Sequence, residues 1–180
     1  RSRGLGDVYK RQLLARGGGS SQCGQTVGES VVLDYSKHQN KILELNVEEK
    51  YVWVQPGVVL DHLNDYLKPH GLWFPVDVST SSRATIGGMS ANNSCGSRSL
   101  YYGNMVHNVL AIEAILDDGS IFQFDQINKN YLATKNNQDR LYKIIDKFID
   151  VRQKVGSEID ANWPTTPVSY THLTLPTICS

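Results

Sequence analysis

Hydrophobic and polar residues alternate along this chain with two periods, which predicts both strands and helices. The run SVVLDY, residues 30–35, is short, apolar and rich in valine, as in a buried strand. Residues 41–57, KILELNVEEKYVWVQPG, alternate with period two on both sides of a charged turn at residues 48–50. This pattern is typical of a hairpin with one covered face. Residues 109–124, VLAIEAILDDGSIFQF, predict a second hairpin, because Asp-Gly tolerates the positive φ of a tight turn.

Two further segments have the spacing of amphipathic helices. The first begins near residue 58 and carries its apolar side chains at helical intervals: Val59, Leu60, Leu63 and Leu67. Pro69 and Gly71 are expected to end it. The second, residues 139–155, places five apolar side chains on one face: Leu141, Ile144, Ile145, Phe148 and Val155. Strands and helices in this uneven order predict a mixed α+β domain.

Both ends of the chain carry peptides that resemble translated sequencing adapters. A back-translation of DVYKRQ, residues 7–12, has a reverse complement that encodes VSYTH, residues 168–172. An inverted DNA repeat would therefore flank the chain. We expect residues 1–12 and 167–180 to be artefacts of this origin, which leaves residues 13–166 as a partial domain truncated at both ends.

The charge balance disfavours nucleic acid or an anionic membrane as a partner. The whole chain has 18 basic and 18 acidic residues. Without the charged residues of the first flanking peptide, acidic residues exceed basic ones by about three. Cys23 and Cys95 lie far apart without metal-ligand spacing, which predicts a reducing cytoplasmic compartment and no metal site.

Two glycine-rich loops stand apart from this scaffold. ARGGGSSQCGQTVG, residues 15–28, places Gly17, Gly18 and Gly19 before two serines. Such amides and hydroxyls form anion-binding concavities, although a flexible linker has the same composition. TIGGMSANNSCG, residues 85–96, would bring Gly87 and Gly88 against a ligand and add short donors near the expected first turn of a helix: Ser90, Asn92, Asn93 and Ser94.

The two loops together predict one elongated ligand with a central anion. They lie about 60 residues apart, and a diphosphate can be held from both sides by two such loops. No G-x-G-x-x-G motif opens a βαβ unit, and no Walker GKS or GKT motif is present. These absences exclude a dinucleotide-binding Rossmann fold and a P-loop NTPase.

Four motifs in order resemble the FAD-binding domain of the FAD-linked oxidase family, which the vanillyl-alcohol oxidase and p-cresol methylhydroxylase group shares. They are RGGGSS from residue 16, GVVLDHLNDYLKPHGLWFPVDVSTSSRATIGGM from residue 57, NNSCGSRSLYYG from residue 92 and VLAIEAILDDGS from residue 109. The family includes the flavoprotein subunits of glycolate oxidases, D-lactate dehydrogenases and D-2-hydroxyglutarate dehydrogenases. The resemblance implies a domain of mixed sheets with flanking helices. NNSCGSRSLYYG is most similar to the long fused flavin and iron–sulfur oxidoreductases.

The resemblance also implies which residues bind FAD. Residues 16–21 match a first pyrophosphate loop, residues 85–88 match a second, and Asp77 and Ser79 match the segment beside the flavin ring. The full set is Arg16, Gly17, Gly18, Gly19, Ser20, Ser21, Gly24, Asp77, Ser79, Thr85, Ile86, Gly87, Gly88, Asn92, Gly96, Tyr102, Gly103 and Val106. Relatives with covalent flavin have a histidine at the position of Ser20, so non-covalent FAD is implied. Val78 stands where many relatives have the second proline of a PDPS motif. The resemblance therefore does not imply the geometry of the loop beside the ring.

The function implied is that of an FAD-dependent oxidoreductase acting on CH–OH groups. Its substrate would be a D-2-hydroxy acid of the D-lactate, glycolate or D-2-hydroxyglutarate class, with hydride passing to the flavin while a base takes the hydroxyl proton. The base of the family lies in a cap domain that this chain does not reach. No catalytic residue is therefore assigned, and the chain by itself is expected to be inactive.

The parent protein is expected to bind the hydroxy acid and to pass electrons to a quinone, a cytochrome or an electron-transfer protein. The resemblance also implies that the parent protein has an iron–sulfur cluster outside this chain and lies peripherally at the inner membrane face. Two alternatives stay open at this point. One is a reductase similar to UDP-N-acetylenolpyruvoylglucosamine reductase, and the other is a flavin-binding module without turnover of its own.

Overall fold

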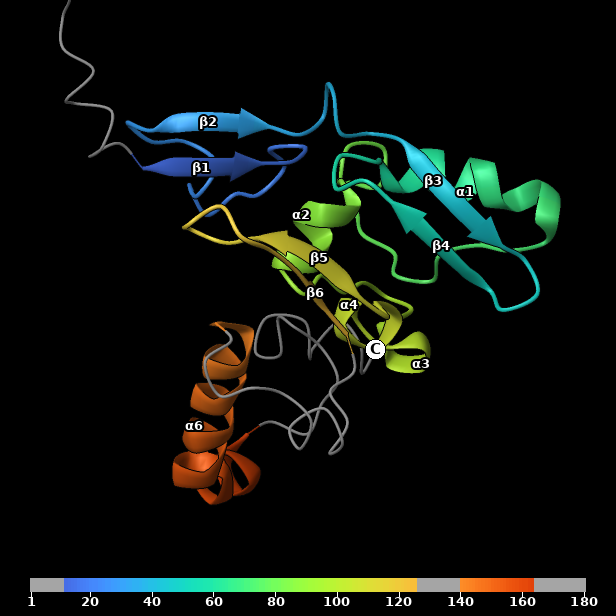
Figure 1. Ribbon diagram of the computed structural model, residues 1–180. Helices are drawn as coiled ribbons and strands as arrows, with labels where there is room; N and C mark the ends of the chain where they lie inside the picture. The colour runs from blue at the N-terminus through green and yellow to red at the C-terminus, as the bar shows by residue number, and fades with distance from the viewer. Residues whose placement is uncertain (1–11, 126–139, 164–180) are drawn as a thin grey trace, which may run out of the picture. The chain divides into compact units, whose positions relative to one another are not determined.

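The computed structural model describes residues 12–125 and 140–163. Of the two flanking peptides, only Gln12 lies among the described residues. The described residues divide into two compact units, residues 12–108 and residues 109–125 with 140–163, and each is described by itself. Helices and short strands are mixed in both units, which confirms the predicted α+β class (Figure 1). None of the described helices has the length and apolar character needed to span a bilayer.

Two pairs of strands belong to the first unit. Strand β1 (Leu13–Arg16) pairs in parallel with β2 (Val31–Asp34), so that Arg16 lies opposite Asp34. Strands β3 (Ile42–Asn46) and β4 (Tyr51–Val54) form the first predicted hairpin. Its turn is closed by the Asn46 side chain, which accepts the Glu49 N–H at 2.9 Å. Lys50 adopts a left-handed φ of 58° in this turn.

The first predicted helix is α1 (Leu60–Leu67), which lies beside the β3–β4 hairpin in Figure 1. It buries Leu60, Leu63 and Leu67, whereas Val59 precedes the helix and is half-buried. A short 3₁₀ turn, η2 (Lys68–His70), follows and contains Pro69. Gly71 then takes a φ of 69°, so the helix ends where the sequence predicts.

The core of the first unit is fixed by backbone pairing between residues 56–60 and residues 84–87. The Ile86 N–H donates to the Val58 carbonyl at 2.8 Å, and the Leu60 N–H donates to the Ala84 carbonyl at 3.0 Å. Helix α2 (Ile86–Ala91) begins at this pairing, and the short helices α3 (Ser99–Tyr102) and α4 (Met105–Asn108) follow. The buried apolar side chains are Val58, Leu60, Leu63, Leu67, Val76, Ala84, Ile86, Met89, Cys95 and Met105.

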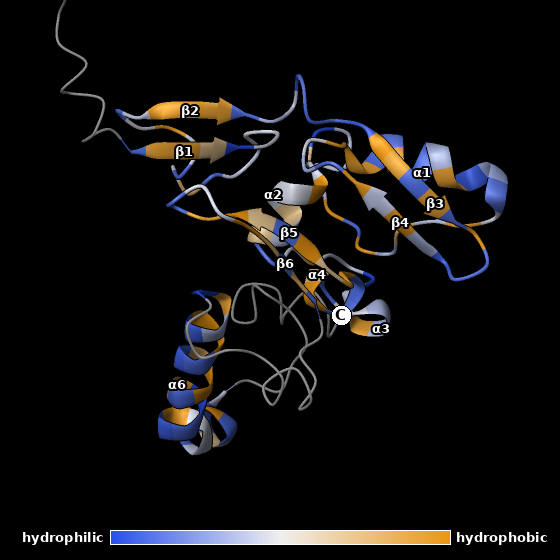
Figure 2. Ribbon diagram, in the orientation of Figure 1, coloured by the Kyte–Doolittle hydropathy of each residue, from blue (hydrophilic) through white to orange (hydrophobic). Residues whose placement is uncertain are grey.

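Strand β2 is less covered than the sequence predicts. Val31, Val32 and Leu33 are 41–43% exposed, and Figure 2 shows apolar residues along both β1 and β2. A sheet of two strands cannot bury its own faces. The prediction of a buried strand is therefore wrong for this segment as the chain stands.

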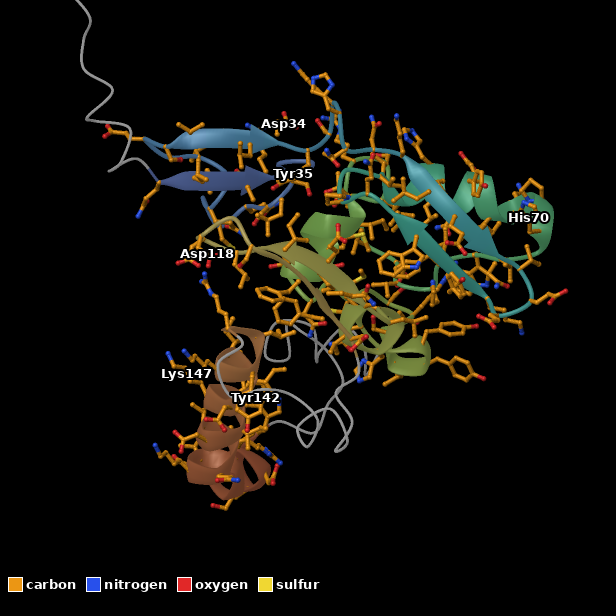
Figure 3. The ribbon with its side chains drawn as sticks, in the orientation of Figure 1. Asp34, Tyr35, His70, Asp118, Tyr142 and Lys147 are labelled. Atoms are coloured by element: carbon orange, nitrogen blue, oxygen red, sulfur yellow. The ribbon has the colours of Figure 1, made fainter. Side chains whose placement is uncertain are left out.

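In the second unit, β5 (Ile112–Ile115) and β6 (Ile121–Phe124) form the second predicted hairpin. Gly119 supplies the positive φ of 82° that the tight turn requires. Asp118, labelled in Figure 3, accepts both the N–H and the hydroxyl of Ser120, at 2.9 and 2.5 Å. The predicted turn chemistry is confirmed.

Helix α6 (Arg140–Asn162) also belongs to the second unit. Arg140 forms ion pairs with Asp117 and Asp118 of the β5–β6 turn. Leu141 and Ile145 are buried, whereas Phe148 is 73% exposed and Val155 is 37% exposed. The predicted helix is confirmed, and the part of the chain that the structure describes buries its apolar face only in the first turns.

Candidate functional site

The loop after β1 presents five consecutive backbone donors. Among the described residues, the N–H groups of residues 17–21 have no acceptor. Gly19 has a φ of 64°, and the Arg16 guanidinium folds back over it. A Cβ at Gly19 would lie only 2.7 Å from Arg16 Nη2. This loop therefore combines unused amides with a positive charge, an arrangement suited to an anion.

The two glycine-rich loops touch each other through glycines of the first loop. A Cβ on Gly17 would overlap the Thr85 hydroxyl, and a Cβ on Gly18 would overlap the Arg83 carbonyl. The same Gly17 Cβ position is 3.7 Å from the Gly88 Cα. The structure thus brings together loops that lie far apart in the sequence, while the binding of FAD by these residues stays a prediction.

The amides at the start of α2 are already used inside the protein. Gly87 donates to the Pro56 carbonyl at 2.8 Å, and Met89 donates to the Thr85 carbonyl at 2.8 Å. Gly88 points its N–H at the Thr85 hydroxyl, 3.4 Å away. The first loop, and not the helix terminus, therefore supplies the unused donors.

Gly87 and Gly88 differ in what surrounds them. A Cβ at Gly87 would lie 2.9 Å from both the Cα and the carbonyl oxygen of Pro56, so close packing already requires glycine there. A Cβ at Gly88 would meet only the Thr85 hydroxyl, at 3.1 Å. Gly88 is exposed, which leaves it the more accessible of the two for a ligand.

The short polar side chains after these glycines lie at the end of α2, not in its first turn as predicted. The helix begins at Ile86 because Thr85 serves as its N-cap, and Asn92 is its C-cap. Asn93 has a positive φ of 44°, and its side-chain oxygen accepts the Val106 N–H at 3.0 Å. These residues close the helix and tie it to α4.

A second cluster joins residues expected beside the flavin ring. The Asp77 carboxylate accepts the Ser97 hydroxyl at 2.6 Å and the Arg98 N–H at 3.0 Å. The Arg98 Cζ lies 5.0 Å from the centre of the Trp73 ring. Tyr102 meets that ring edge-on, with 5.1 Å between centres. Ser97, Arg98 and Trp73 were not predicted as site residues, since no motif spacing marks these contacts.

Four further predicted residues lie outside these two clusters. Gly24 has a φ of 80° and no neighbour within 4 Å of its Cβ position. Gly103 has a φ of 78° and packs against His107. Ser79 and Val106 are exposed. The structure therefore gathers residues 16–19 with residues 83–88, and Asp77 with Gly96, as two clusters.

Asp34 adds a negative charge at the edge of the first loop. It is opposite Arg16 in the β1–β2 pair and stands at the end of β2 in Figure 3. The hydroxyl and the N–H of Ser36 hydrogen-bond to its carboxylate and hold the pKa of Asp34 below its ordinary value. The positive charges of Arg16 and Lys37 lower this pKa further.

Comparison with known proteins finds a family and individual relatives that are similar to this chain. The family described as FAD binding domain matches residues 6–125. The D-2-hydroxyglutarate dehydrogenase of Haemophilus influenzae is 48% identical over 124 residues, which are 69% of this chain and 12% of that protein. The mitochondrial cytochrome-type D-lactate dehydrogenase of Kluyveromyces lactis is 40% identical over 63% of this chain and 20% of its own length.

Solved structures support the fold. The 6-hydroxy-D-nicotine oxidase of Arthrobacter nicotinovorans matches 66% of this chain and 25% of its own, with a TM-score of 0.58 and 17% identity. An alkyldihydroxyacetonephosphate synthase matches 68% of this chain and 25% of its own, with a TM-score of 0.57 and 23% identity. The chain spans between a tenth and a quarter of the length of the curated relatives reported.

We expect Gly18→Ala to destabilise the chain by about 1–3 kcal/mol, because its Cβ would force the first loop away from the Arg83 carbonyl. Gly28→Ala is the matched control, since a Cβ there meets only the Ser30 hydroxyl at 3.7 Å. Urea unfolding followed by circular dichroism measures both. Equal stability of the two variants would contradict the contact between the loops.

The lowered pKa of Asp34 makes its stabilising effect depend on pH. A carboxyl group whose folded pKa is depressed stabilises the fold above its unfolded pKa, about 3.9, and loses this effect as pH falls through the folded pKa. We expect Ser36→Ala to raise the pKa of Asp34 toward the ordinary value in a carbon-13 NMR titration. An ordinary Asp34 pKa with Ser36 present would contradict the assignment.

Proposed function

We propose, since this chain belongs to the FAD binding domain family, that it is the cofactor-binding part of an oxidoreductase that oxidises a D-2-hydroxy acid. Relatives named D-2-hydroxyglutarate dehydrogenase are 40–48% identical to it. Relatives named D-lactate dehydrogenase or glycolate oxidase subunit GlcD are 36–40% identical. These names support the hydroxy-acid class, and within it we propose a substrate of the D-2-hydroxyglutarate type.

One observation carries the cofactor assignment most directly. The amides of residues 17–21 have no acceptor in the described part of the chain, and Arg16 lies over the same loop. The diphosphate of FAD carries two negative charges and accepts several hydrogen bonds at once. Hydrogen bonds to an ionised acceptor are about twice as strong as neutral ones, so this loop fits that group.

In this proposal both clusters bind FAD, each at a different part of the cofactor. In this proposal the amides of residues 17–21 and the Arg16 guanidinium bind the diphosphate, and the surface at Thr85 and Gly88 bounds it. The Asp77 cluster lies on the ring side. Bound flavin supplies a two-electron acceptor for the oxidation of the hydroxy acid.

No residue of this chain is assigned as the catalytic base. Ser20, at the position of the histidine that anchors covalent flavin, supports non-covalent binding, because a serine hydroxyl offers only a hydrogen bond. The names of the curated relatives favour a hydroxy-acid dehydrogenase over the reductase alternative. The electron acceptor, the iron–sulfur cluster and the cytoplasmic location stay predictions.

The activity is tested on the longer protein that contains this chain, purified with its flavin. We expect D-2-hydroxyglutarate to bleach the flavin absorbance in a stopped-flow experiment and L-2-hydroxyglutarate to leave it oxidised. Bleaching by D-lactate alone would contradict the proposed substrate type but keep the reaction class. A flavin that stays oxidised with every D-2-hydroxy acid would contradict the proposed function.

A further inference from the structure

One carboxylate joins two segments that are 20 residues apart in the first unit. Asp77 Oδ2 accepts the Ser97 hydroxyl at 2.6 Å, and Asp77 Oδ1 accepts the Arg98 N–H at 3.0 Å. The preceding residue, Gly96, packs so closely that a Cβ would overlap the Asp77 carbonyl oxygen. Three consecutive residues of the 96–98 loop are thus held by a single residue.

The ends of this loop are anchored separately. Ser99 is 1% exposed, and its hydroxyl accepts the Gly96 N–H at 2.9 Å. Ser94, also buried, accepts the Met105 N–H on its carbonyl at 3.1 Å. Ser97 and Arg98, by contrast, are exposed. The Asp77 carboxylate is therefore what selects the conformation of the loop between anchors that the core already fixes.

The same contact determines where an exposed positive charge lies. With its backbone held by Asp77, Arg98 extends its guanidinium over Trp73, 5.0 Å from the ring centre. Trp73 belongs to the segment that leads to Asp77, and it also meets Tyr102 of α3. Asp77 thus couples the segment predicted beside the flavin ring to residues 96–102.

We propose that Asp77 is a positioning residue of the FAD site, a role that rests on the proposed function of this chain. Its carboxylate acts through the 96–98 loop and does not itself contact the cofactor. The loop held in this conformation presents its backbone to the flavin. Loss of the carboxylate lets the loop, together with Arg98, adopt other conformations that bind FAD less well.

Three variants of the full chain test this role by FAD titration, flavin absorbance spectra and circular dichroism. We expect Asp77→Ala to weaken FAD binding by on the order of tenfold and to change the spectrum of the bound flavin. Asp77→Asn keeps an acceptor for the Arg98 N–H and should bind within about threefold of wild type. Asp118→Ala is the matched control, because this carboxylate also accepts an N–H and a hydroxyl from one serine. It also pairs with Arg140, and neither Ser120 nor Arg140 is a predicted FAD residue.

Ser97→Ala keeps the test decisive if Asp77→Ala does not fold. It removes one exposed hydroxyl and should also weaken FAD binding. In the double variant with Asp77→Ala, the combined loss of affinity should be smaller than the sum of the two single losses. Wild-type affinity in folded Asp77→Ala or in Ser97→Ala would overturn the inference. Equal losses in Asp77→Asn and Asp77→Ala would also overturn it, because the charge itself would then act on the cofactor. A wild-type chain that binds no FAD would contradict the proposed function.

Discussion

The short antiparallel pairing between residues 56–60 and residues 84–87 is the interaction on which the first unit depends. It joins the start of α1 to the start of α2 through three backbone hydrogen bonds, and Gly87 is part of it because only glycine fits against Pro56. The pairing determines where Thr85 lies. Thr85, 2% exposed, in turn forms the surface on which Gly17 rests. Core packing thus positions the loop that carries the unused amides.

This arrangement separates the structural role of a glycine from its role in binding. Gly17, Gly18 and Gly87 lack a side chain because protein atoms occupy the space, whereas Gly88 borders a more open region. Donors are divided in the same way. The α2 amides are used within the protein, whereas those of residues 17–21 have no acceptor in the described part of the chain. In the proposed function, this division lets the chain hold a diphosphate without rearranging its core.

Local chemistry explains what the sequence predicts well. The Asp118–Gly119 turn and the Pro69–Gly71 helix end follow from residues that meet within the same few positions. Contacts at long range are different. Nothing in the spacing shows that Gly18 meets the Arg83 carbonyl or that Asp77 holds Ser97. Whether β2 and Phe148 are buried depends on which other segments pack against them. An apolar pattern predicts which side chains share a face, but it does not show what covers that face.

The central claim is that the amides of residues 17–21 receive the diphosphate of FAD. It is tested most directly by nitrogen-15 NMR of the labelled chain during titration with FAD and, separately, with riboflavin, which has no diphosphate. The account predicts large proton shifts of these amides with FAD and small ones with riboflavin, since a charged acceptor deshields the proton that it binds. Amides of residues 17–21 that do not move when FAD binds would contradict it.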